Sequence, residues 1–217
     1  MHKLVLASTS PRRSALLRDM GIVFETIPSA FIEPDHADGR TPRTHVTSNA
    51  RGKAMDVAAR LKAGIVIGAD TVVVLRGRVL GKPSSMNEAR RYLDALNGQT
   101  HYVLSGICIA DAAHGRVLAA AEKTRVTFRQ LGSHEIERYL ELINPLDKAG
   151  AYAIQGHGAI IVERIAGCYY NVMGLPLARL ETMLMQWGCS LFDCMGPVSR
   201  GSTGPTRTTG VHKRRHP

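Results

Sequence analysis

Short apolar runs alternate with amphipathic segments along most of the chain, and this order predicts an α/β fold on a mixed sheet. Strands are expected at residues 3–7, 22–28, 65–70, 71–75, 78–80, 100–111, 116–129 and 159–164. Helices are expected at residues 11–20, 50–63, 86–96, 133–143 and 175–187. Residues 31–48 and 147–158 are polar or rich in glycine, so both are expected to form loops. The pattern predicts one folded domain over residues 1–190.

Several residues mark where these elements begin and turn. Ser10 can cap the first helix, and Pro11 suits its first position because proline lacks the N–H that would be unpaired there. Arg76 and Gly77 separate two short strand-like runs, a pattern typical of a β-hairpin. Ser133 opens a helix with an incomplete capping box, and Pro176 falls in the first turn of the last helix.

The 217-residue chain carries 28 Lys and Arg against 18 Asp and Glu, a formal charge of +10. Five of those basic residues and no acidic residue lie in residues 197–217, which leaves +5 for residues 1–196. A segment of that composition cannot bury a core, so residues 195–217 are expected to form a disordered basic tail. Aromatic residues make up 5% of the chain, too few for a broad platform that stacks bases. The total charge therefore does not identify the function.

Several classes of protein are excluded by what the chain lacks. No apolar run approaches the roughly 20 residues of a membrane helix, and the run at residues 4–7 is too short for a signal peptide. The four cysteines form no CxxC pair and have no histidine at zinc-ligand spacing, so reduced thiols are expected. A soluble intracellular protein is the expectation.

Common enzyme signatures are also missing. Residues 77–83 lack the spacing and the Ser or Thr of a P-loop, and residues 156–161 lack the third glycine of a dinucleotide loop. Neither HExxH nor GxSxG occurs, which argues against a zincin and an α/β-hydrolase. The chemistry has to come from other residues.

The first group of candidate residues follows the strand at residues 3–7. Ser8, Ser10, Arg12 and Arg13 lie where the N–H groups of a helix N-terminus would face an anion. Two arginines in a first helical turn oppose the helix dipole at about 0.3–1 kcal/mol each, a cost that a bound anion would offset. Side chains that point into solvent are the alternative. This loop is a candidate phosphate site.

Asp70 is expected at the C-terminal end of the strand at residues 65–70, the usual place for an active site in α/β proteins. A carboxylate that caps the next turn fits this position equally well. Glu33, Lys53 and Lys82 are further candidates, each also consistent with a solvated surface group. Together these residues suit a polyphosphate, because carboxylates can hold Mg or Mn while Arg and Lys neutralise a leaving pyrophosphate. With a carboxylate as general base, the predicted chemistry is phosphoanhydride hydrolysis.

Five segments, in sequence order, closely resemble the Maf family of nucleoside triphosphate pyrophosphatases. They are LVLASTSPRRSALL at residues 4–17, IGADT at 67–71, GKP at 81–83, DKAGAYAIQ at 147–155 and NVMGLP at 171–176. The resemblance covers about residues 3–188 and implies an α/β fold with a central cleft, similar to that of the inosine triphosphate pyrophosphatases. It also implies a cytoplasmic homodimer that requires a divalent metal and cleaves between the α and β phosphates. Removal of modified nucleotides and an effect on cell division are roles that the family suggests.

The resemblance implies a role for each candidate residue. Asp70 matches the residue assigned as proton acceptor, and together with Glu33 it is the expected metal ligand. The expected substrate-binding residues are Ser8, Arg12, Arg13, Lys53 and Lys82. Whether Asp70 acts as the base or chiefly as a metal ligand stays open.

Residues 147–155 look like the branch of the family that acts on dTTP and UTP. Arg12, Thr71 and Gln155 match positions linked to substrate choice, and a Gln amide can offer both a donor and an acceptor to a pyrimidine. Ala153 stands where this branch more often has Gly, a small departure that would tighten the base pocket. The implied activity is hydrolysis of dTTP and UTP to the monophosphate and pyrophosphate.

Two other functions stay open at this point. In the first, the basic surplus and the arginine pair bind a nucleic-acid backbone, which predicts an affinity that falls steeply with salt and depends on the tail. Deleting residues 197–217 would abolish such binding but leave enzymatic turnover nearly unchanged. In the second, the chain is an inactive member used for protein interaction, which the retained Asp70, Lys82 and arginine pair argue against. The expected partners are a nucleoside triphosphate and a second copy of the chain, without stable nucleic acid or a membrane.

Overall fold

The computed structural model describes residues 3–34 and 39–196. The helices are α1 (Pro11–Asp19), α2 (Pro42–Ala58), α3 (Met86–Leu96), α4 (Ser133–Leu142), α5 (Tyr169–Met173) and α6 (Leu177–Met185). The strands are β1 (Leu4–Leu6), β2 (Phe24–Thr26), β3 (Ile65–Leu75), β4 (Arg78–Leu80), β5 (Thr100–Asp111), β6 (Val117–Phe128) and β7 (Val162–Ala166). Short 3₁₀ turns lie at Ala149–Ala151, Gly156–Ile160 and Phe192–Cys194. Within the described ranges, no helix is both long enough and apolar enough to span a bilayer.

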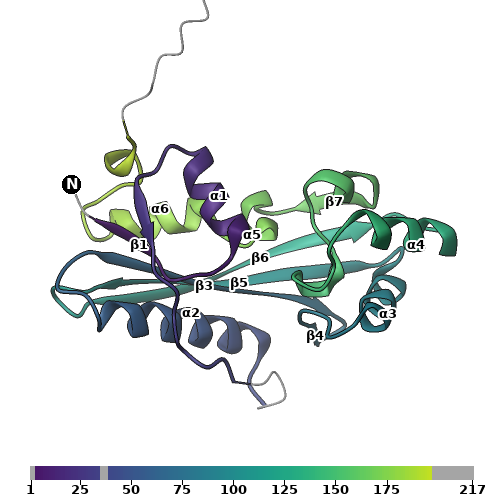
Figure 1. Cartoon of the computed structure of the whole chain (residues 1–217), viewed down its shortest axis with the longest axis horizontal. Helices are drawn as coiled ribbons and strands as arrows, with labels where there is room; N and C mark the ends of the chain where they lie inside the picture. Colours follow the sequence, from purple (N-terminus) through teal and green to yellow (C-terminus); the bar gives the residue numbers. More distant parts are fainter. Residues whose placement is uncertain (1–2, 35–38, 197–217) are drawn as a thin grey trace, which may run out of the picture.

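A mixed sheet organises these elements. Its strands run in the order β2-β1-β3-β5-β6-β7, with β4 paired to the far part of β3. β1 is parallel to β2 and β3, and the other pairs are antiparallel. The helices α1, α5 and α6 lie on one face of the sheet and α2 on the other, while α3 and α4 lie at the end near β4 and β7 (Figure 1). The predicted α/β fold with flanking helices is confirmed.

The side chains of the central strands alternate between two cores. One set packs with α1 and α6 and consists of Leu4, Leu6, Ile65, Ile67, Ile107 and Ile109. The intervening set packs with α2 and consists of Val5, Val66, Cys108 and Ala110. Because successive residues of a strand point to opposite faces, this alternation also decides where polar residues farther along β3 point.

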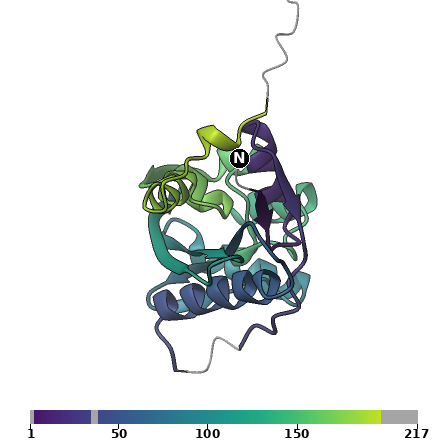
Figure 2. The same ribbon diagram turned by 90° about the vertical axis from the view of Figure 1, so that its left-hand side faces the viewer.

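Two glycines let α2 approach the sheet closely. A Cβ at Gly68 of β3 would lie 2.2 Å from the carbonyl oxygen of Ala50, and one at Gly106 of β5 would lie 2.0 Å from that of Val46. These contacts are to backbone atoms, so a larger residue would push the helix away from the sheet. Seen from the end of the sheet, α2 lies directly against the strands (Figure 2). The close approach brings polar side chains of α2 within hydrogen-bond range of β3.

The start of α2 differs from the prediction. The helix begins at Pro42, so the loop expected over residues 31–48 is wrong from that residue onward. The Thr41 hydroxyl accepts the backbone N–H of Thr44, and Pro42 occupies the first helical position. Composition favours a helix only in the alanine-rich half, whereas the Thr-Pro pair at residues 41–42 is the signal for its true start.

Several other boundaries also differ. The strand expected at residues 159–164 is displaced to β7, because the preceding residues form a 3₁₀ turn. α5 was not expected, and β2 is shorter than the predicted strand. Ser10 occupies the N-cap of α1 without a side-chain capping bond, and Gly132 rather than Ser133 is the N-cap of α4. Pro176 is the N-cap of α6 rather than part of its first turn.

The expected hairpin is confirmed, whereas Met195 and Gly196, the first two residues of the expected disordered tail, are bonded to the folded domain. Arg76 and Gly77 adopt positive φ angles of 48° and 81° between β3 and β4, as a two-residue hairpin turn requires. Gly196 donates its N–H to the carbonyl of Gly21, beside an isolated bridge between adjacent residues. The rest of the predicted tail, residues 197–217, lies outside the described residues.

Candidate active site

The candidate site lies at a gap along one edge of β3. β1 pairs with β3 as far as Ile67, and β4 pairs with it from Val73 onward. Among the described residues no strand pairs with this edge of β3 between these points, so the edge is open there although α2 covers one face of the strand. A cavity of about 530 Å³ occupies this place. The cleft implied by the sequence is therefore present.

The residues predicted from the sequence converge on this cavity. Its lining includes Ser8, Ser10, Arg12, Arg13, Glu33, Lys53, Asp70, Thr71, Lys82 and Gln155. They come from the loops after β1 and β2, from the first turn of α1, from α2, from the middle of β3, from the turn after β4 and from the segment that precedes β7. Residues that are far apart in the sequence therefore share one surface.

Asp70 lies in the middle of β3, so the prediction that the strand ends there is wrong. The β-branched residues 71–74 continue the strand, and Asp70 pairs with Gly106 of β5 on the covered edge. The parallel strand β1 does end beside it, so Asp70 still lies at the C-terminal end of a neighbouring strand. By the alternation of β3, Asp70 points to the face of α2 and Thr71 points to the opposite face.

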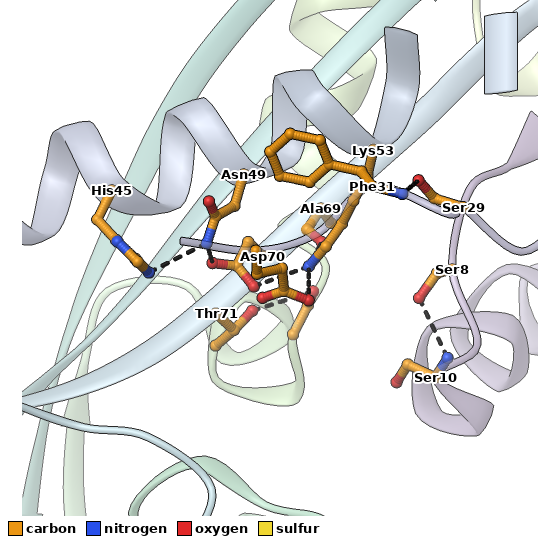
Figure 3. Close-up of polar contacts among 12 residues, drawn as sticks. Ser8, Ser10, Ser29, Phe31, His45, Asn49, Lys53, Ala69, Asp70 and Thr71 are labelled. Atoms are coloured by element: carbon orange, nitrogen blue, oxygen red, sulfur yellow. Dashed lines mark hydrogen bonds and ion pairs between the residues drawn. The ribbon is translucent and has the colours of Figure 1, made fainter. Parts of the chain in front are cut away.

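Two residues of α2 hold the buried carboxylate of Asp70 (Figure 3). Lys53 Nζ lies 3.0 Å from Oδ1, and Asn49 Nδ2 donates to Oδ2 at 3.0 Å. Burial by itself would raise the pKa of Asp70. The charges of Lys53 and Arg13 and the two hydrogen bonds outweigh burial and hold this pKa below its usual value. Asp70 is therefore ionised at neutral pH.

Asn49 is a residue of the site that the sequence did not reveal. Its Nδ2 also lies 3.0 Å from Nε2 of His45, and both residues are buried. His45, Asn49 and Lys53 follow one another at intervals of four residues, so they share one face of α2. That spacing was informative only for a helix that begins at Pro42.

Glu33 reaches the site through Lys53. Its Oε1 lies 2.9 Å from Lys53 Nζ, so one ammonium group joins Glu33 to Asp70. The described residues contain no cluster of three or more His, Cys, Asp or Glu side chains able to hold a metal. Mg²⁺ in proteins uses one or two carboxylates and takes its remaining ligands from water and phosphate oxygens. The two carboxylates therefore fit a cation that binds together with a polyphosphate.

Arg13 points inward from the first turn of α1. Its Nε donates to the carbonyl of Gly174 at 2.8 Å, and its terminal nitrogens donate to Ser8 Oγ and Thr71 Oγ1, each at 3.2 Å. All three acceptors are neutral, whereas the carboxylate of Asp147 pairs with the neighbouring Arg12. Burial lowers the pKa of Arg13, an effect that nearby Asp70 opposes. A fixed cation held by neutral acceptors therefore faces the cavity.

Arg12 has different surroundings from Arg13. It is more exposed and contacts Asp147 twice, at 3.4 Å to the carboxylate and 3.0 Å to the backbone carbonyl. This contact links the first turn of α1 to the start of segment 147–155. Lys82 lies exposed at the rim of the cavity, in the turn between β4 and α3. The two arginines therefore differ: Arg13 points into the cavity with its donors bound to protein acceptors, whereas Arg12 is more exposed to solvent.

Buried aromatic side chains support segment 147–155, which forms one wall of the cavity. Tyr152 is 5% exposed, and its hydroxyl lies 2.8 Å from Nε2 of His101. The rings of Tyr152, His101 and Phe128 make mutual edge-to-face contacts. This packing holds the backbone that presents Gln155 to the cavity.

His101 is expected to make the stability of the fold depend on pH. Burial lowers the pKa of His101 to about 4, whereas the unfolded chain binds this proton near pH 6.5. The unfolded state therefore binds more protons between these values, and the free energy of unfolding is expected to fall by about 2–3 kcal/mol as pH drops through this window. Above pH 6.5 both states are neutral, and below pH 4 both are charged, so the contribution levels off on either side.

Urea unfolding at pH 7.5 and pH 4.5 measures this effect. The His101→Gln protein is expected to lose less stability between the two pH values than the parent does. His134→Gln, a change at an exposed histidine, is the matched control and is expected to behave like the parent. Equal losses in the parent and in His101→Gln would contradict the assignment.

Comparison with known proteins identifies the family. The family described as Maf-like protein matches residues 3–187. A dTTP/UTP pyrophosphatase from Pelotomaculum thermopropionicum is 48% identical over 188 residues, which cover 87% of this chain and 98% of that protein. Proteins of the same name from Dictyoglomus thermophilum and Caldicellulosiruptor saccharolyticus are 43% and 44% identical, covering 87% and 88% of this chain and 98% of each relative. This chain therefore belongs to the Maf-like protein family, as its five motifs predicted.

Solved structures give a more distant match. A HAM1 protein from Coxiella burnetii aligns with 59% of this chain and 73% of its own, at 18% identity and a TM-score of 0.41.

Proposed function

We propose that this protein is a nucleoside triphosphate pyrophosphatase that hydrolyses dTTP and UTP to the monophosphate and pyrophosphate. The names of its relatives support the reaction and the substrates. The observation that carries the proposal is the cavity at the gap in β3, which Arg13, Lys53 and Lys82 line together with Asp70 and Glu33. Cations that can bind a triphosphate therefore line the same cavity as a buried carboxylate that can accept a proton from water.

The triphosphate is bound by the cations of the cavity. Arg13 is the anchor, because a guanidinium has five N–H donors and only three are used by Gly174, Ser8 and Thr71. Lys82 reaches the phosphates from the rim, and Lys53 reaches them from α2. Ser8, from the loop after β1, and Arg12, from the first turn of α1, complete the binding at a helix N-terminus, where backbone N–H groups favour anions.

Asp70 is the proposed proton acceptor. In the free protein its low pKa makes it a weak base, because Lys53 and Arg13 stabilise the charged form. Phosphate oxygens that bind these two cations weaken their effect on the carboxylate, so the pKa of Asp70 rises as the substrate binds. Water then adds to the α-phosphorus, the bond from that phosphorus to the bridging oxygen breaks, and Asp70 takes the proton of the water.

A divalent cation, Mg²⁺ or Mn²⁺, is part of the proposal, and Glu33 and Asp70 are its proposed protein ligands. When bound, such an ion neutralises charge on the phosphates and on the leaving pyrophosphate. Lys53 keeps the two carboxylates together in the free protein, since it contacts both. Asp70 has two carboxylate oxygens, so one can bind the ion while the other accepts the proton. The charge of the ion lowers the pKa of this carboxylate and so opposes the rise that the bound phosphates cause.

The choice of base is assigned to segment 147–155 and the residues around it. The amide of Gln155 can pair with a pyrimidine edge, which offers both a donor and an acceptor. The hydroxyl of Thr71 already contacts Arg13, Ser105 and the carbonyl of Gly174. We therefore assign Thr71 an indirect part in substrate choice, through the position of Arg13. Arg12 is likewise assigned an indirect part, because it contacts Asp147 and so helps to position segment 147–155.

A panel of nucleoside triphosphates tests the proposal. The purified chain is incubated with dTTP, UTP, dCTP, CTP, dATP, dGTP and modified pyrimidine triphosphates, with Mg²⁺, Mn²⁺ or EDTA, and pyrophosphate release is measured. The expected result is release from dTTP and UTP that requires the metal. Cleavage of purine triphosphates alone would show that the assignment through Gln155 is wrong, and release of inorganic phosphate instead of pyrophosphate would contradict attack at the α-phosphorus.

A homodimer and a cytoplasmic location complete the proposal. Both follow from the resemblance to the family, and a cytoplasmic enzyme would meet the cellular pool of triphosphates. Light scattering of the purified chain measures the mass in solution and so tests the dimer.

A further inference from the structure

Segment 28–33 carries Glu33 to the cavity and is attached to α2 along its length. It follows β2 and runs beside the C-terminal half of α2 (Figure 1). Glu33 itself has a half-exposed side chain, and its ion pair with Lys53 is the contact that places it in the site. The position of this carboxylate therefore depends on how the segment before it is held.

Asp56 of α2 holds the backbone of this segment. Its Oδ2 accepts the hydroxyl of Ser29 at 2.9 Å and the backbone N–H of Ala30 at 2.8 Å. Arg60, one turn later, donates to the same oxygen at 3.0 Å and to the carbonyl of Pro28 at 2.8 Å. The N–H of Ala30 and the hydroxyl of Ser29 lower the pKa of Asp56, so this anchor is ionised at neutral pH. Three donors thus converge on one carboxylate oxygen.

Gly52 of α2 provides the space for the ring of Phe31, the residue after Ala30 in the segment. A Cβ at Gly52 would lie 2.4–2.6 Å from three ring carbons of Phe31, so the ring rests directly on the helix backbone. Figure 3 shows Phe31 beside Lys53, with its N–H bonded to Ser29 Oγ at 3.0 Å. The segment is therefore fixed at two successive points before it reaches Glu33.

Lys53 and Asp56 are three residues apart and so lie on neighbouring positions of the same face of α2. One of them binds the carboxylate of Glu33, and the other binds the backbone that carries Glu33. We infer that Asp56, together with Gly52, is a positioning residue that sets the place of Glu33 beside Lys53. The inference rests on the proposed function, because it assigns Asp56 an effect on catalysis through Glu33.

A double-mutant cycle tests this inference. The values of kcat and KM for dTTP are measured with Mg²⁺ for the parent, Asp56→Ala, Glu33→Gln and the double variant. Displacement of a reacting group by about 1 Å costs up to about 10²-fold in rate, so Asp56→Ala is expected to lower kcat/KM by about tenfold. In a protein that already has Glu33→Gln, the further change Asp56→Ala is expected to cost less than about twofold, because the effect passes through Glu33.

Conservative and matched variants separate positioning from general damage. Asp56→Asn keeps an oxygen that can accept from Ser29 and Ala30, so it is expected to restore most of the activity lost in Asp56→Ala. Asp94→Ala removes an exposed carboxylate that also pairs with an arginine four residues away, and it is expected to change nothing. Gly52→Ala, which moves Phe31, is expected to show the same lack of additivity with Glu33→Gln and serves if Asp56→Ala does not fold.

The outcomes distinguish this inference from the proposed function. If the parent is active and the losses of kcat/KM in Asp56→Ala and Glu33→Gln multiply in the double variant, the inference is overturned but the proposed function is not. The same holds for an active parent in which Asp56→Ala and Gly52→Ala leave kcat/KM unchanged. A parent that releases pyrophosphate from no nucleoside triphosphate would overturn the proposed function, and the positioning role with it.

Discussion

Asp70→Asn is expected to lower kcat/KM for dTTP by about 10³-fold, within the range for loss of a general base. The amide that replaces the carboxylate has the same shape but cannot accept a proton or stabilise the charge of Lys53. The fold is expected to survive, because the carbonyl oxygen of the new amide can still accept from Lys53. Asn49 can adapt as well, since its Oδ1 has no hydrogen-bond partner among the described residues and can turn to accept from the new amide.

Steady-state rates of pyrophosphate release, with circular dichroism and thermal melting as checks on the fold, measure this result. Asp94→Asn is the matched control, because Asp94 has a half-exposed side chain and pairs with Arg90 on the surface of α3. It is expected to retain the parent rate. A folded Asp70→Asn protein that hydrolyses dTTP at the parent rate would refute the role given to Asp70 both as base and as metal ligand.

The parts of the site that could be predicted are those whose residues signal their role locally. Ser8 follows an apolar run and Arg12 and Arg13 follow Pro11 at the start of a helix, so the loop and the helix start could be predicted locally. That this loop binds an anion stays a prediction. Lys82 is a candidate from its own sequence and Gln155 from the family resemblance, and both line the cavity. In each case, a short stretch of sequence contains the information.

The parts that escaped prediction depend on pairing between distant segments. A charge that follows an apolar run predicts that the strand ends at Asp70. In the fold β3 continues, and the charge is tolerated because β1 stops and β4 starts on either side of it, which leaves an open edge. No sequence pattern near Asp70 indicates where β1 stops or where β4 starts. The gap that forms the cavity is a property of sheet topology.

α2 shows how one missed boundary hides several residues of a site. With the helix expected to start at residue 50, Asn49 fell outside it and its four-residue spacing from Lys53 went unused. Once the helix begins at Pro42, Asn49, Lys53 and Asp56 fall along one side, and all of them make contacts at or near the cavity. Gly68 and Gly106, which let α2 approach, were likewise readable only from the packed structure.

Arg13→Lys is expected to lower kcat/KM for dTTP by about 10²-fold, although it keeps the positive charge. The guanidinium of Arg13 reaches Gly174, Ser8 and Thr71 in three directions and still has donors to spare for phosphate oxygens. An ammonium group has three donors on a single atom and cannot satisfy these partners and the substrate together. Its flexible stem would also leave the charge less well placed against the developing negative charge of the transition state.

The same rate assay measures this change, with Arg18→Lys as the control, because Arg18 lies exposed in the last turn of the same helix. Arg18→Lys is expected to match the parent. The three hydrogen-bond partners of Arg13 are neutral, so loss of these bonds leaves no carboxylate unpaired. The melting temperature of Arg13→Lys is therefore expected to fall by only a few degrees. Parent-level kcat/KM in Arg13→Lys would show that a positive charge alone suffices at this position, and that the fork geometry fixed by Gly174, Ser8 and Thr71 does not contribute to catalysis.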